Sequence, residues 1–180
     1  MSTASDQRDR AAVVLAALRR TRQVRQFTDD PVSEGDLRAI LNVARWTGSS
    51  TNWQPWQFHV IRDGAMRARL AELAPNARHV AGAPLAIAIV MPGEKPAWES
   101  YDEGRVAERI LIAARALGLG AGIGWVTSRY RTGVADLLGL VEPSYVRTVI
   151  SLGHPTPAAR QPKSAPGAAR KPLSELVVDR

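Results

Sequence analysis

The sequence contains no cysteine, which excludes disulfides, thiolate nucleophiles and cysteine-ligated metal or iron–sulfur sites. It also lacks a long apolar run, since the longest, Pro84 to Met91, has the length of a strand rather than of a bilayer span. Residues 1–10 are polar and charged, without the apolar core of a signal peptide. Its histidines, His59, His79 and His154, show no metal-ligand spacing. We therefore expect a cytoplasmic protein with no metal site and no membrane partner.

Motifs for side-chain catalysis are missing as well. The sequence has no G-x-S-x-G nucleophile elbow. Ser49 and Ser50 have no base beside them, and no carboxylate pair stands out for hydrolytic work. A protein without a catalytic side chain depends on a bound cofactor for its chemistry.

The charge is strongly one-sided, with a formal net charge of +7. Arginine is concentrated only at residues 19–25 and 160–171, and neither segment has the interleaved aromatics of a single-strand binder. Duplex binding through the net charge stays open as a minor alternative. An anionic small molecule explains the clustered arginines equally well, and we expect no nucleic-acid partner.

Periodicity and capping residues predict an α+β fold, with a mostly antiparallel sheet packed by helices. Ser33 and Asp63 are good helix N-caps, and the apolar run to Met91 is typical of a strand covered on both faces. The expected helices cover residues 9–18, 33–46, 63–75, 105–117 and 132–138. The expected strands cover residues 57–61, 84–91, 119–126 and 145–152, and residues 92–98 are expected as a loop.

The chain is expected to form one domain with two extensions. Residues 1–8 are predicted as a flexible N-terminus and residues 9–154 as the domain. Residues 155–180 form a proline-rich arm, since residues 155–172 contain five prolines. The apolar end of this arm, Leu173 to Val178, is expected to dock, with a second subunit as one candidate surface.

The segment Thr47 to Phe58 is the most informative stretch. It combines small polar side chains with flexible backbone and two tryptophans. Such a loop suits hydrogen bonding to a flat, heteroatom-rich ring. A polar turn above two packed indoles is an equally good interpretation of this segment alone.

Glycines at 118, 120, 122 and 124 follow a predicted helix and open a strand, which is the reverse of the dinucleotide fingerprint. Gly118 is better interpreted as a helix C-cap, and the others as sites of close packing or close ligand approach. Arg22, Arg25 and the pair Arg170-Lys171 are candidate phosphate clamps. A solvated basic surface is the alternative for each cluster.

Taken together, these segments resemble the nitroreductase family of FMN-dependent oxidoreductases. Four stretches carry the likeness, in the family's order. They are Arg22-Gln23-Val24-Arg25-Gln26-Phe27 with Pro31-Val32, Ser49-Ser50-Thr51-Asn52-Trp53-Gln54-Pro55-Trp56, Ala114 to Gly120, and Gly153-His154-Pro155 with Arg170-Lys171-Pro172-Leu173. The second stretch is the most specific.

The resemblance implies a homodimer with FMN at the subunit interface and a C-terminal arm that adds a strand to the partner's sheet. It implies hydride transfer from NAD(P)H through the flavin to a small organic acceptor, such as a nitro compound or a quinone. The site residues implied are Arg22, Gln23, Arg25, Ser49, Ser50, Asn52, Gln54, Gly122, Ile123, Gly124, Trp125 and Arg170. A flavin-storage protein of the same fold is the alternative function.

Three departures from the family pattern concern the site. Thr21 stands where the family often has an arginine, and Gly48 replaces the usual proline before the serines. The segment from Met91 to Asp102 is short, so the flavin is expected to be open or roofed by Trp98 and Tyr101.

Overall fold

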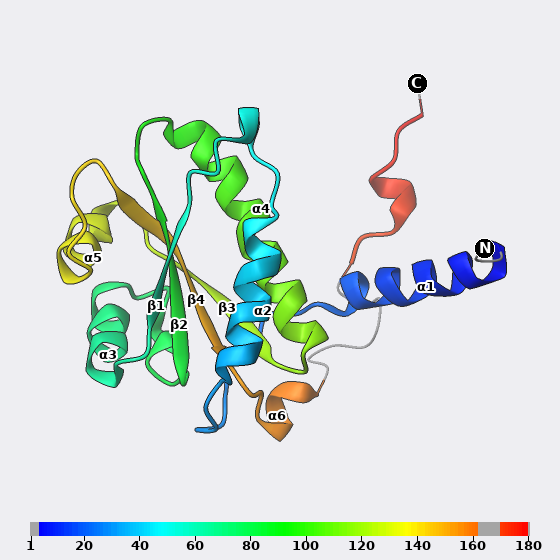
Figure 1. The fold of residues 1–180 in the computed structure, drawn as a ribbon, viewed down its shortest axis with the longest axis horizontal. Helices are drawn as coiled ribbons and strands as arrows, with labels where there is room; N and C mark the ends of the chain where they lie inside the picture. Colours follow the sequence, from blue (N-terminus) through cyan, green and yellow to red (C-terminus); the bar gives the residue numbers. More distant parts are fainter. Residues whose placement is uncertain (1–3, 162–169, 180) are drawn as a thin grey trace.

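The computed structural model describes residues 4–161 and 170–179, and its centre is a four-stranded antiparallel sheet. The strand order is β1-β2-β4-β3, so β1 and β3 form the two edges (Figure 1). The strands are β1 (Gln57–Ile61), β2 (Leu85–Met91), β3 (Gly120–Trp125) and β4 (Tyr145–Gly153). All four strands lie where the sequence predicts them, and the α+β class is confirmed.

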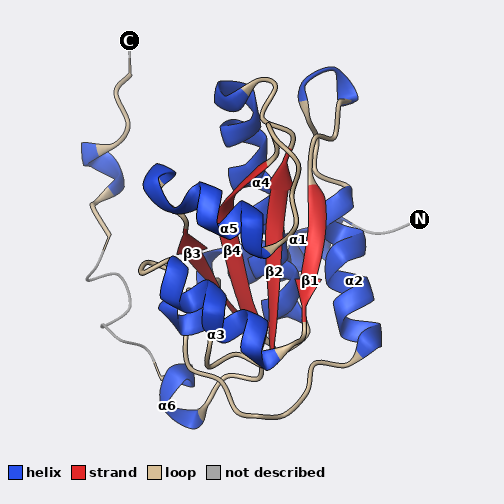
Figure 2. Ribbon diagram, turned by 90° about the vertical axis from the view of Figure 1, so that its left-hand side faces the viewer, coloured by secondary structure: helices blue, strands red, loops and turns tan. Residues whose placement is uncertain are grey.

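Helices cover both faces of this sheet. α2 (Glu34–Arg45) and α4 (Pro96–Ala116) lie on one face, and α3 (Gly64–Leu73) and α5 (Arg131–Leu137) lie on the other (Figures 1 and 2). Every residue of β2 is buried, as its apolar sequence predicts. The side chains alternate between the two cores, because successive strand residues point to opposite faces.

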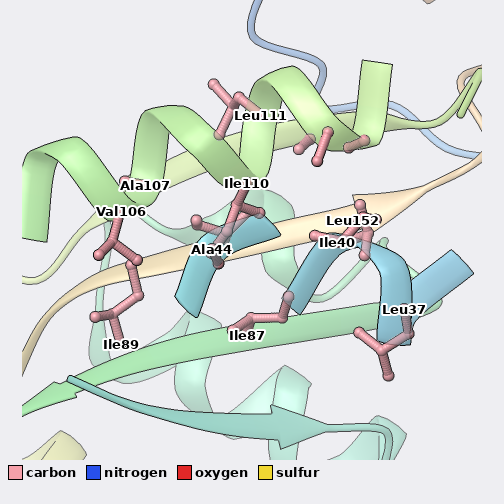
Figure 3. Packing of buried hydrophobic residues seen from close by; sticks show 14 of the residues in the cluster. Leu37, Ile40, Ala44, Ile87, Ile89, Val106, Ala107, Ile110, Leu111 and Leu152 are labelled. Atoms are coloured by element: carbon pink, nitrogen blue, oxygen red, sulfur yellow. The ribbon is translucent and has the colours of Figure 1, made fainter. Parts of the chain in front are cut away.

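The larger core lies between the sheet and the pair α2 and α4 (Figure 3). Ile87 and Ile89 of β2 meet Ile40 of α2 and Ile110 of α4, and all four side chains have no exposed surface. Truncating one such isoleucine to alanine typically costs about 2–5 kcal/mol. This core fixes the position of α4 and hence of the strand β3 that follows it.

The caps predicted for α2 and α3 are present. The Ser33 hydroxyl accepts a hydrogen bond from the Asp36 amide at 3.0 Å. The Asp63 carboxylate accepts one from the Met66 amide at 2.7 Å. Gly118 follows α4 with φ of +77°, which agrees with its expected role at the helix C-terminus.

The start of α4 differs from the expectation. The helix begins at Pro96, so the last three residues of the loop expected at 92–98 are helical. The buried face of its first turns carries carboxylates, Glu99, Asp102 and Glu103, which concealed the apolar periodicity. Glu99 accepts hydrogen bonds from the amides of Gly93 and Lys95, which tie the preceding turn to the helix.

Two segments extend from the domain. α1 (Ala4–Arg20) begins before the expected Asp9, and much of its length projects from the body (Figure 1). At the other end, α6 (Pro157–Arg160) is followed by residues 170–179, which contain the short 3-10 turn η4 (Leu173–Glu175). The part of the expected arm at residues 162–169 lies outside the described residues. In the described part of the chain, no helix is both long enough and apolar enough to span a bilayer.

Candidate functional site

The outer edge of β3 is the centre of the candidate site. Gly122 of β3 pairs with Ser151 of β4. The residues on either side of Gly122, Ala121 and Ile123, direct their peptide groups away from β4. Residues 23–24 satisfy the peptide at 121, since the Val24 amide donates to the Ala121 carbonyl at 2.8 Å. Asn76 forms a one-residue bridge with Trp125. The edge is therefore covered at both ends.

The Ile123 peptide lies between these two bridges and is contacted by side chains. Its N–H donates to Gln23 Oε1 at 2.6 Å. Its carbonyl accepts from Arg25 Nη2 at 3.4 Å and lies 3.3 Å from His79 Nε2. Gln23, Arg25 and Ile123, which the sequence predicts as site residues, are thus brought together.

A cavity of about 520 Å³ opens beside this peptide. Its lining combines predicted residues with three polar residues from the segment between α3 and β2. The lining residues are Arg25, Pro75, Asn76, Arg78, His79, Ile123 and Trp125. Among these residues there are two guanidinium groups and no carboxylate. The cavity therefore favours a ligand with negative charge or with several hydrogen-bond acceptors.

The glycines of β3 allow the neighbouring segments to approach. A Cβ at Gly122 would lie 2.3 Å from the Val24 carbonyl oxygen, and one at Gly124 would lie 2.5 Å from Ala77 Cβ. Close packing thus accounts for both glycines, although their neighbours are an extended segment and a turn rather than a helix. The same packing places Arg25 and His79 at the Ile123 carbonyl.

The His79 ring is held in place by a buried hydroxyl group of β4. Its Nδ1 lies 2.8 Å from Ser151 Oγ, and Ser151 has no exposed surface. Burial is the main factor that lowers the pKa of His79 below its usual 6.5, and the charge of Arg25 lowers it further. The hydrogen bond with the Ile123 carbonyl opposes this change.

The loop with the most specific sequence motif has a tightly bonded backbone. It contains the 3-10 turn η1 (Ser50–Asn52), and Thr51, Asn52 and Gln54 have positive φ angles of 51°, 56° and 51°. Ser49 Oγ accepts from the Gln54 amide at 2.8 Å, and Gln54 Nε2 donates to Asn52 Oδ1 at 3.1 Å. Positive φ at non-glycine residues is costly and is concentrated at functional sites.

This loop is separated from the β3 edge within one chain. It leads directly into β1, which is the opposite edge strand of the sheet. It is held by the N-terminal half of α4, where Arg105 Nη1 donates to the Gly48 carbonyl at 2.6 Å. Figure 1 shows it at the top of the molecule, away from the 21–25 segment. The structure therefore does not bring Ser49, Ser50, Asn52 or Gln54 together with Arg25.

The predicted phosphate-binding arginines are also apart from each other. The exposed Arg22 donates through Nη1 to the carbonyls of Arg19 and Thr21, at 2.7 and 2.8 Å. Arg170 is exposed and lies in the C-terminal segment, away from the sheet (Figures 1 and 2). Neither residue lines the cavity at β3.

The expected roof residues, Trp98 and Tyr101, lie on the exposed side of α4, with 57% and 72% of their surfaces accessible. Lys95 Nζ lies 5.1 Å from the centre of the Trp53 ring and 6.0 Å from that of Trp98. These aromatics belong to the same end of the molecule as the loop at 48–54. They do not line the cavity beside Ile123 in the same chain.

The sequence reasoning missed the contribution of Asn76, Arg78 and His79. The expected helix at 63–75 ends at Pro75, and His79 shows no metal-ligand spacing, so the sequence alone predicts no site residue here. The available signal was a polar cluster placed directly after a helix and before a buried strand, which is a common position for binding residues on loops.

Comparison with known proteins is consistent with this geometry. Residues 18–77 match the model of the nitroreductase family. A relative from Archaeoglobus fulgidus, named NADH dehydrogenase/NAD(P)H nitroreductase, is 33% identical over 74% of this chain and 80% of its own. A relative of the same name from Methanothermobacter thermautotrophicus is 32% identical over 79% of this chain and 77% of its own.

Solved structures share the fold. A nitroreductase from Desulfovibrio desulfuricans, in complex with FMN, superposes with a TM-score of 0.80 at 30% identity and covers 93% of this chain and 96% of its own. An FMN-dependent nitroreductase from Clostridium difficile gives a TM-score of 0.82 at 23% identity, over 92% of this chain and 99% of its own.

Proposed function

Because this chain belongs to the nitroreductase family, we propose that it is an FMN-dependent oxidoreductase. In this function it transfers a hydride from NAD(P)H to a small organic acceptor such as a nitro compound or a quinone. The observation that carries the proposal is the cavity beside the Ile123 peptide, which has Arg25 and Arg78 in its lining. The FMN complex of the Desulfovibrio desulfuricans relative supports the choice of cofactor.

The residues of this edge fit a flavin. The cavity volume of about 520 Å³ lies within the usual range of about 300–1,000 Å³ for ligand pockets. The Ile123 N–H is held at the edge only by Gln23 Oε1, so a ring acceptor can replace that partner. Arg25 and Arg78 supply positive charge that stabilises negative charge on a reduced ring. When bound, FMN supplies the hydride-transfer chemistry.

Arg22 and Arg170 are proposed to bind the FMN phosphate. A guanidinium group forms two parallel charge-assisted hydrogen bonds with phosphate and keeps its charge at all working pH values. Arg22 is exposed next to the segment that covers β3, and its present acceptors are carbonyls of its own turn. Exchanging these carbonyls for phosphate oxygens requires only a side-chain movement.

The remaining predicted residues are proposed to come from a second copy of the chain. Ser49, Ser50, Asn52 and Gln54 lie at the opposite sheet edge from β3, so one chain does not form the whole site. In a homodimer, the loop of one protomer can reach the β3 edge of its partner. Exposed apolar residues on α1 and after Pro172 support such an assembly, because they have no cover within the chain.

The test is an absorption spectrum of the purified protein before and after anaerobic addition of NADH or NADPH. We expect a yellow protein whose flavin band is bleached by one or both nicotinamides. Protein that stays colourless after reconstitution with FMN would contradict the proposal.

A flavin-storage function is a second candidate, favoured by one observation. Only residues 92–95 separate β2 from α4, so this connection provides no additional segment to cover the cavity. The same experiment separates the two functions. Bound flavin that neither nicotinamide reduces would indicate storage.

A further inference from the structure

The ring of His79 makes contacts that its neutral form cannot all satisfy. Three distances are short enough for hydrogen bonds: His79 Nδ1 to Ser151 Oγ at 2.8 Å, Ser151 Oγ to the Gly122 carbonyl at 3.3 Å, and His79 Nε2 to the Ile123 carbonyl at 3.3 Å. Each contact requires one hydrogen. A neutral imidazole and a hydroxyl supply two hydrogens, whereas an imidazolium and a hydroxyl supply three. The geometry is therefore complete only for the protonated ring.

The surrounding charges oppose that protonated form. Arg25 approaches the same Ile123 carbonyl as His79, and Arg78 lines the same cavity. Ser151 of β4 and the backbone of β3 are the other groups in contact, and the cavity lining in the described structure contains no carboxylate. Burial and the Arg25 charge accordingly lower the pKa of His79. The hydrogen-bond geometry thus favours the protonated His79 ring, whereas burial and the neighbouring positive charges disfavour it.

Negative charge in the cavity would offset this repulsion. We propose that His79 is a positioning residue that takes up one proton from solvent when the ring bound beside Ile123 becomes negatively charged. The inference rests on the proposed function, because it takes the bound ring to be a flavin. With the proton in place, both ring nitrogens donate, and the Gly122 and Ile123 carbonyls are held by Ser151 and His79 together.

The step is balanced in charge and atoms. A hydride from NAD(P)H carries two electrons and one proton to the flavin, which gains one negative charge, and the oxidised nicotinamide leaves. His79 then binds one proton from solvent, so the net charge of the site is restored. No further oxidant or reductant is required.

The test is the midpoint potential of FMN-loaded protein as a function of pH, between about pH 5 and 8, where histidine titrates. Each proton taken up with two electrons contributes about 30 mV per pH unit. Over the window in which His79 is neutral with oxidised flavin and charged with reduced flavin, we expect a slope of about −59 mV per pH unit for the wild type. His79→Gln, which retains hydrogen-bonding groups but does not titrate, is expected to show about −30 mV per pH unit there.

Two further variants test the assignment. His59→Gln alters a histidine on the opposite edge strand and is expected to keep the wild-type slope. Ser151→Ala removes the hydroxyl that accepts from Nδ1 of the protonated His79 ring. Because the protonated ring loses this partner, the pH window with the steeper slope is expected to move to lower pH. If His79→Gln retains FMN poorly, His79→Asn replaces it.

The outcomes separate the inference from the function. The reduced flavin ring can itself bind a proton, and this contribution to the pH slope is the same in the wild type and in every variant. Equal slopes in the wild type and His79→Gln would overturn the role of His79 while leaving the function intact. A chain that retains no FMN would instead contradict the proposed function.

Discussion

Glu103 shows how burial acts on one ionisable residue. It has 1% of its surface exposed, and Arg147 Nη1 lies 3.7 Å from its carboxylate, longer than a hydrogen bond. Burial raises the pKa of Glu103 above its usual 4.5, while the neighbouring Thr148 and the charges of Arg147 and Arg131 oppose this without cancelling it. The protonated form is therefore the one that the fold favours.

We predict the consequence for stability. Because the pKa of Glu103 is higher in the folded state, its contribution is fully present below about pH 4.5 and is lost as the pH rises through the folded-state value. Glu103→Gln removes this dependence, so the difference in the free energy of unfolding between variant and wild type should shift in favour of the variant as the pH rises. Urea unfolding at several pH values measures it. A difference that does not change with pH would contradict the prediction.

Arg22 and Arg170 are predicted to contribute to FMN affinity. Removing one charge-assisted hydrogen-bonding group costs about 1.5–3 kcal/mol, which corresponds to roughly a 10- to 150-fold weaker FMN affinity for Arg22→Ala and Arg170→Ala. Quenching of FMN fluorescence measures it. Arg69→Ala, which removes an exposed arginine paired with Glu72 on α3, is the matched control and should bind FMN normally. Native affinity in both test variants would show that the phosphate assignment is wrong.

At the scale of elements, β3 depends on the segment packed along its outer edge. Gly122→Ala is predicted to displace residues 24–25, because the new Cβ would lie 2.3 Å from the Val24 carbonyl oxygen and 3.1 Å from Arg25 Cγ. Backbone at this distance has to move, so we expect FMN affinity to fall by at least about tenfold and stability to fall by about 1–3 kcal/mol. Gly82→Ala, where the added Cβ meets nothing within 4 Å, is the control. Equal FMN affinities for both variants would argue against this role of the glycine.

The loop at 48–54 depends in the same way on α4. Arg105 donates to the Gly48 carbonyl at 2.6 Å, and its guanidinium lies 5.6 Å from the Tyr101 ring. Arg105→Ala should loosen the loop and weaken FMN binding by roughly 10-fold, because a charge-assisted hydrogen bond is worth about 1.5–3 kcal/mol and its loss acts on FMN only through the loop. Arg109→Ala removes a hydrogen bond to Trp46, before the loop, and should have a smaller effect. Binding titrations of the two variants decide the comparison.

At the scale of the whole molecule, the exposed apolar surface predicts assembly. Val13, Val14, Leu15 and Leu18 of α1 are between 45% and 72% exposed, and Leu173, Leu176, Val177 and Val178 between 51% and 75%. Two such segments on one protein of this size indicate an interface. We expect a dimer by light scattering after gel filtration.

Leu15→Asp should shift this protein toward the monomer and release FMN, because a buried carboxylate at the interface is strongly unfavourable. Gln7→Glu adds the same charge at an exposed polar position of α1 and should remain dimeric. A chain that ends at Gln161 lacks the arm. Like Leu15→Asp, it should dimerise less and bind FMN more weakly. A monomeric wild type that binds FMN fully would show that one chain forms the site.

Much of the architecture followed from local sequence. The strands at 57–61 and 85–91 and the caps at Ser33 and Asp63 were predictable because alternation and capping depend on neighbouring residues. The start of α4 was not, because Glu99, Asp102 and Glu103 are polar side chains on a buried face. Tertiary structure supplies the partners of two of these carboxylates, since the amides of Gly93 and Lys95 donate to Glu99 and Arg105 contacts Asp102.

The sequence by itself determined the family, the α+β class and the residue types that suit a flavin. Tertiary structure decided which of them meet. Gln23 and Arg25 reach Ile123 across about a hundred residues because β3 is an edge strand with unpaired peptide groups. Asn76, Arg78 and His79 join them through a connection whose local sequence has no distinctive motif. The loop at 49–54 is separated from them because β1 is the opposite edge, and we therefore propose that a second chain completes the site.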